Sequence, residues 1–506
     1  MINTEKFDLL YKIKEQSAEC EFLYEFSIDK IIGMITPDIK TQKYMLDIFS
    51  YPLIEKENII YRREIIKDFV KYPNLLLKLV GIFSEFDKLS EEIKNSKILF
   101  FKMKSVSKYD EGVVSIEENH ELINLSLTNL YVEKIISYIE NLNNEFLLYD
   151  LKSFGLLSLK NYCCSLVNSE EYKKLKNIVS NIEKLSLLTC SFNISLEVDE
   201  NLNAKKAKLN DIIHKNVSIF ENENFIIDDR KKYAISMNKK SNFEINNYLK
   251  EAVNDINLVL YNIYETIFDK IKDLSKQLTF YSFSLRYYDI INKNPLNYCF
   301  AEILEKENNC IECEDLYDLY LSLYNDKKYG IFHKKVISND VIINKEFKGI
   351  LIKGDNDSGK TVFLRSIATA QLFSQIGLPI NAKNAKISIR KGIYANFSSE
   401  EKFDNTLNNE AGRFENEVLK FSEIFNKIDN NSILFLNEIF QTTAYNEGTV
   451  GIYNILDYLS KMKVQWIFVT HLTELFNMFK NNNVKNVLFL STSTEKESIY
   501  KLIKNN

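Results

Sequence analysis

The fold of this chain is decided by the stretch Ile350-Leu-Ile-Lys-Gly-Asp-Asn-Asp-Ser-Gly-Lys-Thr361, in which an apolar run enters a G-x-x-x-x-G-K-T loop. Backbone N–H groups at this spacing wrap a phosphate. The lysine, Lys360, reaches the β and γ oxygens, and the hydroxyl of Thr361 is a Mg²⁺ ligand. The loop therefore predicts nucleotide binding, with ATP and Mg²⁺ as the ligands.

An ordinary glycine-containing turn is the alternative, so the flanking residues matter. Gly349–Lys353 is a short apolar run of the kind a buried parallel strand needs. Apolar residues then recur at helical spacing up to Phe373, and Gly377-Leu-Pro379 marks a helix end. This order of strand, loop and helix favours the phosphate loop. Its candidate nucleotide-binding residues are Gly354, Asp355, Asn356, Asp357, Ser358, Gly359, Lys360, Thr361 and Val362.

A second buried strand, Ser432-Ile-Leu-Phe-Leu-Asn-Glu438, ends in polar residues. Open α/β sheets bind ligands at the carboxyl ends of their strands. P-loop ATPases usually have Asp where this chain has Asn437, and that Asp holds Mg²⁺. We expect Thr361 and Asn437 to face the metal, with weaker Mg²⁺ coupling and slow ATP turnover. Glu438 is the candidate that polarises the attacking water.

A third apolar run, Val464-Gln-Trp-Ile-Phe-Val-Thr-His471, ends in a histidine. A single histidine at a strand end is more often structural than catalytic. Here one helix, Glu447 to about Lys461, joins this strand to the strand that ends at Glu438, and neighbouring parallel strands bring their carboxyl ends together. His471 is therefore expected to sense the γ-phosphate or orient the water.

Together these motifs resemble the ATPase domain of the MutS family, the ABC-type ATPases of DNA mismatch repair and recombination, over Val336–His471. The family's loop reads Gly-Pro-Asn-Met-Gly-Gly-Lys-Ser and shares Asn356. Val336-Ile-Ser-Asn339 stands where the family has an apolar-x-x-Asn segment near the adenine. The segment Asn437–Gly448 aligns without a gap on Asp-Glu-Ile-Gly-Arg-Gly-Thr-Ser-Thr-Tyr-Asp-Gly, and Thr470-His471 matches Thr-His.

The resemblance implies a homodimer formed through the ATPase domains. The family's Ser-Thr-Phe-Met-Val-Glu signature reaches the γ-phosphate of the partner, and this chain has Gly412-Arg-Phe-Glu-Asn-Glu417 there. Phe414 and Glu417 fit the signature, whereas Gly412-Arg413 stands in place of the Ser-Thr pair. Arg413 either contributes charge in trans, as arginine fingers do, or is a solvated residue at a helix start.

The remaining chain predicts a helical region. Among 506 residues, 45% hydrophobic and 27% charged, only 13 are Gly and 5 are Pro, which disfavours a sandwich or barrel. We expect a multidomain protein with an N-terminal helical segment (1–30), an α-helical core, lever and clamp region (31–330, the clamp at about 190–245) and an α/β P-loop ATPase domain (331–506). Because few residues precede Lys40, the resemblance implies a short member without mismatch-recognition and connector domains.

Charge gives little support for nucleic-acid binding, because the formal net charge is −5. DNA as a partner rests on the resemblance and on one basic run with an aromatic residue. Such runs are usually solvated surfaces. No signal segment and no apolar run of membrane-spanning length is present, so we expect a cytoplasmic protein without a membrane partner. The candidate DNA contacts are Arg230, Lys231, Lys232, Lys239 and Lys240.

Two functions remain open from the sequence. In the first, a DNA-binding ATPase of mismatch repair or recombination uses ATP binding and hydrolysis in dimerised heads to clamp DNA. In the second, a scaffold protein is switched by nucleotide, hydrolyses it slowly and does not recognise mismatches. Asn437 and the missing Ser-Thr pair favour the scaffold, whereas Lys360, Glu438 and His471 favour the enzyme.

The basic run is testable. Neutralising Lys231, Lys232, Lys239 and Lys240 together should flatten the dependence of DNA affinity on salt, because fewer counterions are released. Affinity is measured by fluorescence anisotropy across a salt series. Unchanged affinity and slope would show that DNA does not contact this run.

Overall fold

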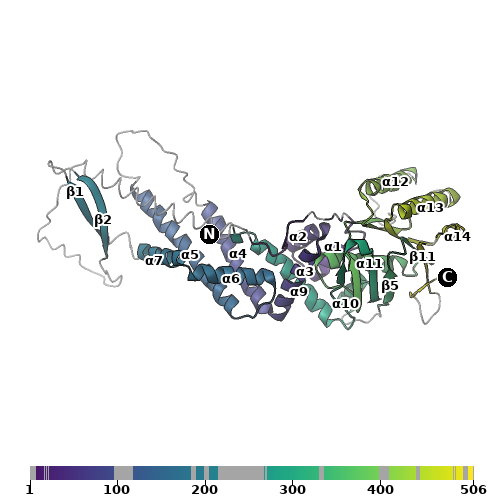
Figure 1. Cartoon of the computed structure of the whole chain (residues 1–506), viewed down its shortest axis with the longest axis horizontal. Helices are drawn as coiled ribbons and strands as arrows, with labels where there is room; N and C mark the ends of the chain where they lie inside the picture. The colour runs from purple at the N-terminus through teal and green to yellow at the C-terminus, as the bar shows by residue number, and fades with distance from the viewer. Residues whose placement is uncertain are drawn as a thin grey trace. The chain divides into compact units, whose positions relative to one another are not determined.

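The computed structural model describes residues 7–15, 18, 20, 22–95, 118–183, 190–198, 204–214, 267, 270–329, 336–397, 410–439, 445–482, 484, 486–493 and 500–504. Its contacts divide the chain into two compact units, whose elements are labelled in Figure 1. Unit 1 comprises Met1–Asp8, Asn74–Leu151 and Leu156–Lys276, and unit 2 comprises Leu9–Pro73, Lys152–Gly155 and Gln277–Asn506. Each unit is described by itself.

Unit 1 is built on helices and a β-hairpin. Helix α5 packs against α7 through buried side chains that include Ile136 and Tyr172, and the Tyr172 hydroxyl donates to Ile136 O at 3.3 Å. Strands β1 and β2 are antiparallel, although they lie in the region expected to be helical. In the described part of the chain no helix is both long and apolar enough to cross a membrane. The elements that lie wholly or mostly in unit 1 are α4 (Pro73–Asn95), α5 (Glu118–Leu147), α6 (Phe154–Asn168), α7 (Glu170–Glu183), β1 (Cys190–Val198) and β2 (Ala204–His214).

Unit 2 contains a six-stranded sheet with the order β12-β11-β6-β10-β9-β8. All its pairings are parallel except that of β11 with β12. The apolar runs expected to be strands are therefore β6, β9 and β10, and they are neighbours in the centre of the sheet. The strands are β6 (Gly349–Lys353), β8 (Gly392–Phe397), β9 (Ser432–Asn437), β10 (Gln465–Thr470), β11 (Val487–Thr492) and β12 (Leu502–Lys504).

The helices that connect these strands cover both faces of the sheet. From β8 to β11 the chain moves across the sheet in one direction, through α12 (Glu410–Lys427), α13 (Tyr445–Lys461) and α14 (Thr473–Asn481). The helix after β6, α11 (Lys360–Ile376), belongs to a connection that runs the other way. Right-handed crossovers place α11 on the opposite face from α12, α13 and α14, as Figure 1 shows.

A second, four-stranded sheet has the order β3-β7-β4-β5. Two of its strands, β3 (Glu302–Leu304) and β4 (Ile311–Leu316), come from the region expected to be helical, whereas β5 (Asn339–Ile343) and β7 (Asn384–Ser388) lie within the ATPase region. In β4, buried residues such as Cys313 alternate with more exposed ones. This period-two pattern over so few residues is easily missed beside long helices.

In the described part of the chain, five helices that precede α11 in the sequence belong wholly or mostly to unit 2. They are α1 (Ile28–Ile35), α2 (Ile39–Ser50), α3 (Lys56–Lys71), α9 (Leu274–Lys293) and α10 (Leu319–Tyr329). Helix α11 contacts α2, α3 and α10 as well as β9 and β10, and nearly all of its side chains are buried. It ends at Gly377, whose φ of 94° permits the left-handed helix cap. The helix expected from Val362 is therefore the centre of unit 2.

Two buried arginines of α3 hold the C-terminal end of α11. Arg62 Nη1 donates to Ile376 O at 3.3 Å, and Arg63 Nη2 donates to Ser374 O at 3.2 Å. Arg62 also lies over the rings of Tyr11 and Phe280, at 5.0 and 5.1 Å from their centroids. Cations at a helix C-terminus are stabilised by its unpaired carbonyls and its dipole.

We therefore expect Arg62→Ala to lower the free energy of unfolding of unit 2 by about 3 kcal/mol, because buried carbonyls lose a charged donor. The only tryptophan, Trp466, is buried in β10, so its fluorescence during urea titration reports on unit 2. Glu64→Ala, an exposed site on the same helix, is the control and should change stability by less than about 0.5 kcal/mol. Equal effects of the two substitutions would contradict the capping role.

Candidate nucleotide-binding site

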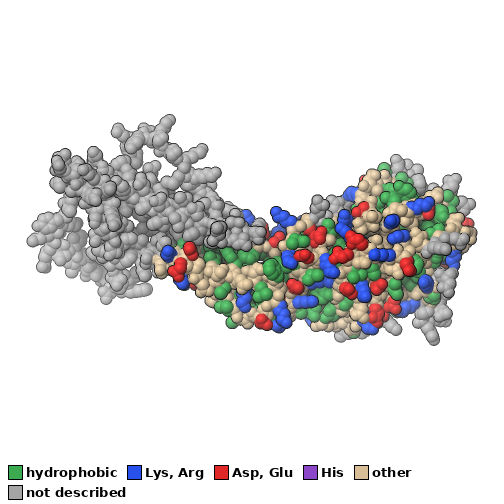
Figure 2. All heavy atoms as spheres, viewed as in Figure 1, with side chains coloured by type: hydrophobic (Ala, Val, Ile, Leu, Met, Phe, Trp, Pro, Cys, Tyr) green, Lys and Arg blue, Asp and Glu red, His purple; other side chains and the backbone are tan. Residues whose placement is uncertain are grey.

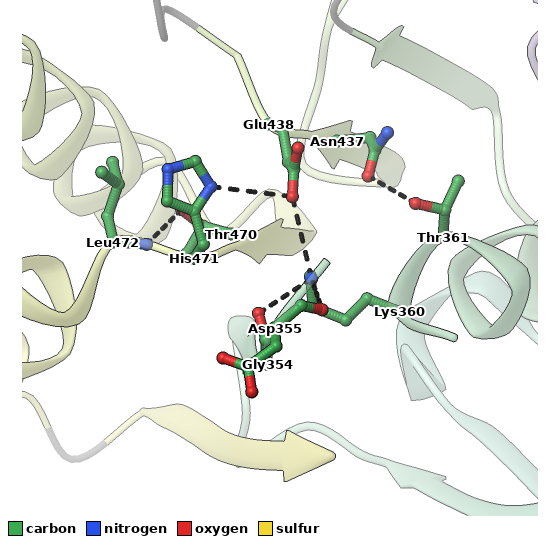
Figure 3. Close-up of polar contacts among 9 residues, drawn as sticks. All are labelled: Gly354, Asp355, Lys360, Thr361, Asn437, Glu438, Thr470, His471 and Leu472. Carbon is green, nitrogen blue, oxygen red and sulfur yellow. Dashed lines mark hydrogen bonds and ion pairs between the residues drawn. The ribbon is translucent and has the colours of Figure 1, made fainter. Parts of the chain in front are cut away.

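The three predicted motifs meet at one edge of the six-stranded sheet. Thr470 of β10 pairs with Lys353 of β6, and Val469 pairs with Asn437 of β9. The carboxyl ends of the three strands therefore lie side by side. Figure 3 shows the phosphate loop, the Asn437-Glu438 pair and His471 around one space. Parallel pairing brings together residues that are more than 100 positions apart in the sequence.

Lys360 is held by the loop that precedes it. Its Nζ donates to Gly354 O at 2.8 Å and to Asp355 O at 2.6 Å, and the Glu438 carboxylate lies 3.8 Å away. Only 4% of the side chain is exposed. Burial lowers the pKa of Lys360, whereas the charges of Glu438, Asp355 and Asp357 act to raise it. The ammonium group is thus desolvated, held by two backbone carbonyls and close to the Glu438 carboxylate.

Thr361 and Asn437 contact each other directly. The Thr361 hydroxyl donates to Asn437 Oδ1 at 3.1 Å (Figure 3). The first turn of α11 and the end of β9 thus present two neutral oxygens at the same place. Both are hard oxygen donors of the kind that Mg²⁺ accepts beside phosphate oxygens.

Glu438 lies between Lys360 and His471. Its Oε1 is 3.8 Å from His471 Nδ1, and 21% of its side chain is exposed, against 44% for His471. The backbone φ of Glu438 is 50°, a left-handed conformation that is costly for a residue with a Cβ. The N–H of Glu438 donates to Val469 O at 3.0 Å and so ties this residue to β10. The backbone conformation turns the carboxylate toward the loop instead of along the strand.

Residues from the C-terminal part of the chain support the phosphate loop, and the sequence did not identify them. A Cβ on Gly354 would lie 2.1 Å from Thr492 Oγ1, and a Cβ on Gly359 would lie 3.1 Å from Tyr500. Tyr500 is fixed in turn by Asn339, which donates from Nδ2 to Tyr500 O at 3.3 Å and accepts from Leu502 N at 2.9 Å. The side chain of Asn339 therefore holds the backbone around Tyr500 in place. The two residues are far apart in the sequence, so no pattern of neighbouring residues could predict this contact.

The other candidate residues are placed as follows. Asp355, Asn356 and Asp357 are exposed on the loop, and Ser358, Gly359 and Val362 are partly exposed. Arg413 and Phe414 belong to helix α12, but their side chains lie outside the described part of the structure. The basic candidates Arg230, Lys231, Lys232, Lys239 and Lys240 also lie outside the described residues.

The described residues fit a nucleotide with Mg²⁺. Ser358 Oγ is buried without a hydrogen-bond partner, the desolvated Lys360 ammonium faces the loop, and Thr492 leaves no room for a side chain at Gly354. Donors concentrated on a glycine-containing loop at a helix N-terminus suit a phosphate. The Thr361 and Asn437 oxygens are suitable metal ligands.

Comparison with known proteins agrees with this geometry. Residues 350–505 match the protein family described as MutS domain V. The chain is 27% identical to the Endonuclease MutS2 of Clostridium tetani over 194 residues, 37% of this chain and 24% of that protein. For the Endonuclease MutS2 of Levilactobacillus brevis the identity is 33% over 143 residues, 28% of this chain and 18% of the relative. The matches thus cover about a quarter or less of these relatives.

The close approach at Gly354 predicts that Gly354→Ala abolishes nucleotide binding, because the added Cβ would displace Thr492 or the loop itself. Affinity is measured by isothermal titration calorimetry with ADP and Mg²⁺. Gly451→Ala in α13 is the control, since a Cβ there meets nothing within 4 Å. Adding Thr492→Ala should restore part of the affinity, and wild-type affinity in Gly354→Ala would contradict the packing argument.

Proposed function

We propose, from the premise that residues 350–505 are a domain V ATPase of the MutS family, that this chain is a DNA-binding ATPase whose nucleotide cycle gates clamping on DNA. The observation that carries the proposal is the meeting of Lys360, Thr361, Asn437, Glu438 and His471 at one sheet edge. Lys360, Thr361, Glu438 and His471 have the chemistry that ATP hydrolysis uses at these positions, and Asn437 supplies a neutral oxygen in place of the usual carboxylate. The cellular process is mismatch repair or recombination.

The loop and Lys360 bind the phosphates. Backbone N–H groups between Gly354 and Thr361 donate to the β-phosphate, and Lys360 exchanges its carbonyl partners for phosphate oxygens. This exchange is favourable because the buried ammonium gains a full negative charge in place of two carbonyl dipoles. Mg²⁺, held by Thr361 and Asn437, would neutralise charge on the phosphate oxygens.

Glu438 and His471 act on the water. The Glu438 carboxylate accepts a hydrogen bond from the attacking water and polarises it, while its backbone conformation keeps it aimed at the loop. His471, 3.8 Å from that carboxylate, orients the water or contacts the γ-phosphate. Both side chains are partly exposed, so water reaches them without a structural change.

The proposal includes a homodimer in which the start of α12 faces the partner's nucleotide. Arg413 and Phe414 would then supply the trans contact, with the Arg413 guanidinium meeting the γ-phosphate. DNA would be held by the helical region and by the basic run from Arg230 to Lys240. Figure 2 shows basic and acidic side chains intermixed on the visible face of the described residues, so DNA contact would depend on a local cluster of charge.

A nucleotide-switched scaffold is the second candidate, and Asn437 is the observation that favours it. Its amide oxygen carries no charge, so the metal is held less strongly at the end of β9 than a carboxylate would hold it. Slow hydrolysis would make bound ATP a long-lived signal to protein partners. DNA would then have no direct effect on turnover.

ATP turnover with and without DNA separates the two candidates. The full chain is assayed alone and with homoduplex, mismatched and branched DNA, beside Lys360→Ala and Glu438→Ala. Stimulation by DNA that disappears in both variants and persists in Glu474→Ala, an exposed control in α14, supports the clamping ATPase. Rates of ATP turnover, or nucleotide affinities, that are the same with and without DNA support the scaffold.

A Mg²⁺ titration of ATP turnover tests the role of Asn437. Asn437→Asp should lower the Mg²⁺ concentration needed for half-maximal activity by about threefold or more, because a carboxylate attracts the ion more strongly than an amide. Identical titration curves for the wild type and the variant would show that Asn437 is not close to the metal.

A further inference from the structure

The phosphate loop of this protein carries two carboxylates of its own. Asp355 and Asp357 are both exposed on the loop whose backbone would receive the phosphates. Asp357 has a φ of 63°, and the carbonyl of Asp355 accepts from Lys360 Nζ at 2.6 Å. Neither residue can withdraw far from the site, since the backbone of each is part of the loop itself.

The charges around Lys360 are therefore mostly negative. The Glu438 carboxylate lies 3.8 Å from its Nζ, and Figure 3 shows the Asp355 carboxylate pointing away from Glu438, on the other side of the ammonium. The charges of Glu438, Asp355 and Asp357 all act to raise the pKa of Lys360, in keeping with their positions on and beside the loop. One ammonium thus lies in a region that carries three carboxylates.

The side chain that ends β9, Asn437, is neutral. Asn437 presents an amide oxygen to the Thr361 hydroxyl, at 3.1 Å, where a carboxylate would have attracted a cation. Besides Glu438, the negative charge that favours a cation therefore lies on the loop, at Asp355 and Asp357, and not at position 437. A metal-free nucleoside triphosphate, with about four negative charges, would meet these carboxylates with only the Lys360 ammonium to compensate them.

We infer that Asp355 and Asp357 make this a site for nucleotide carrying a divalent cation and exclude metal-free nucleotide at the binding step. The inference rests on the proposed function and deepens it by defining the ligand of the phosphate loop as the nucleotide–metal complex. The cation reduces the repulsion between the polyphosphate of the nucleotide and the carboxylates of the loop. This role in binding is separate from its role in hydrolysis. Asp355 and Asp357 are thus specificity-determining residues.

The expected size of the effect follows from Coulomb's law. Because both side chains are exposed, solvent screens each repulsion, and each carboxylate should weaken the binding of metal-free nucleotide by about threefold to tenfold. The two together should weaken it by roughly 10- to 100-fold. Added salt should reduce the effect, since the repulsion is screened within about 10 Å at 0.1 M.

The test measures binding and does not depend on turnover. The full chain is titrated calorimetrically with AMPPNP, a non-hydrolysable ATP analogue, in Mg²⁺ and in EDTA. The variants are Asp355→Asn, Asp357→Asn and the double variant, because asparagine keeps the side-chain shape and tolerates the left-handed backbone at position 357. Asp47→Asn, an exposed site on α2, is the matched control.

We expect the wild type to bind AMPPNP at least roughly 10-fold more tightly in Mg²⁺ than in EDTA. The double variant should reduce this ratio to within about threefold by tightening the binding in EDTA, whereas Asp47→Asn should leave it unchanged. Equal wild-type affinities in the two buffers, or a ratio that the Asn variants leave unchanged, would overturn the inference alone. Failure of the wild type to bind AMPPNP in either buffer would overturn the proposed function with it.

Discussion

The structure of unit 2 depends on the anchoring of helix α11 at both ends. Its first turn carries Lys360 and Thr361, and its 17 residues span about 25 Å to a C-terminal end held by Arg62 and Arg63. The backbone of Leu53 exchanges hydrogen bonds with Gln375, whose backbone carbonyl accepts and whose side-chain amide donates. Because α11 is almost wholly buried, neither end can shift without repacking the sheet and the N-terminal helices. The nucleotide loop is therefore attached to the helices around α3 by one rigid element.

The electrostatics of the site follow from where its charges are placed. Lys360 is buried beside two carbonyls, Glu438 is turned toward it by a left-handed backbone, and Asn437 places a neutral amide beside Thr361. The carboxylate that is absent at position 437 has counterparts on the loop, Asp355 and Asp357. This distribution favours binding of a nucleotide whose charge is already partly neutralised. The residues proposed to select the ligand, Asp355 and Asp357, belong to the same loop that is proposed to bind the phosphates.

Local patterns predicted those parts of the fold in which the physical signal is contained in a few neighbouring residues. The apolar runs that became β6, β9 and β10 and the helical spacing after Lys360 are of this kind, and the resemblance to the MutS ATPase domain is confirmed for residues 350–505. The strands β3 and β4 were missed because three to six residues carry too little periodicity beside long helices. The domain boundaries and the roles of Arg413 and the basic run stay predictions.

The sequence by itself determined the candidate phosphate loop, the carboxylate Glu438 and the histidine His471. Each belongs to a motif whose residue spacing follows from the chemistry it is expected to perform. Only the tertiary structure decided that Thr492 and Tyr500 pack against the loop glycines, that Asn339 holds Tyr500, and that Arg62 and Arg63 cap α11. Those contacts join residues more than 100 positions apart, and they form only because parallel pairing and burial of α11 bring distant segments together. The sequence around each of these residues does not reveal its distant partner, because each residue alone resembles an ordinary surface or core residue.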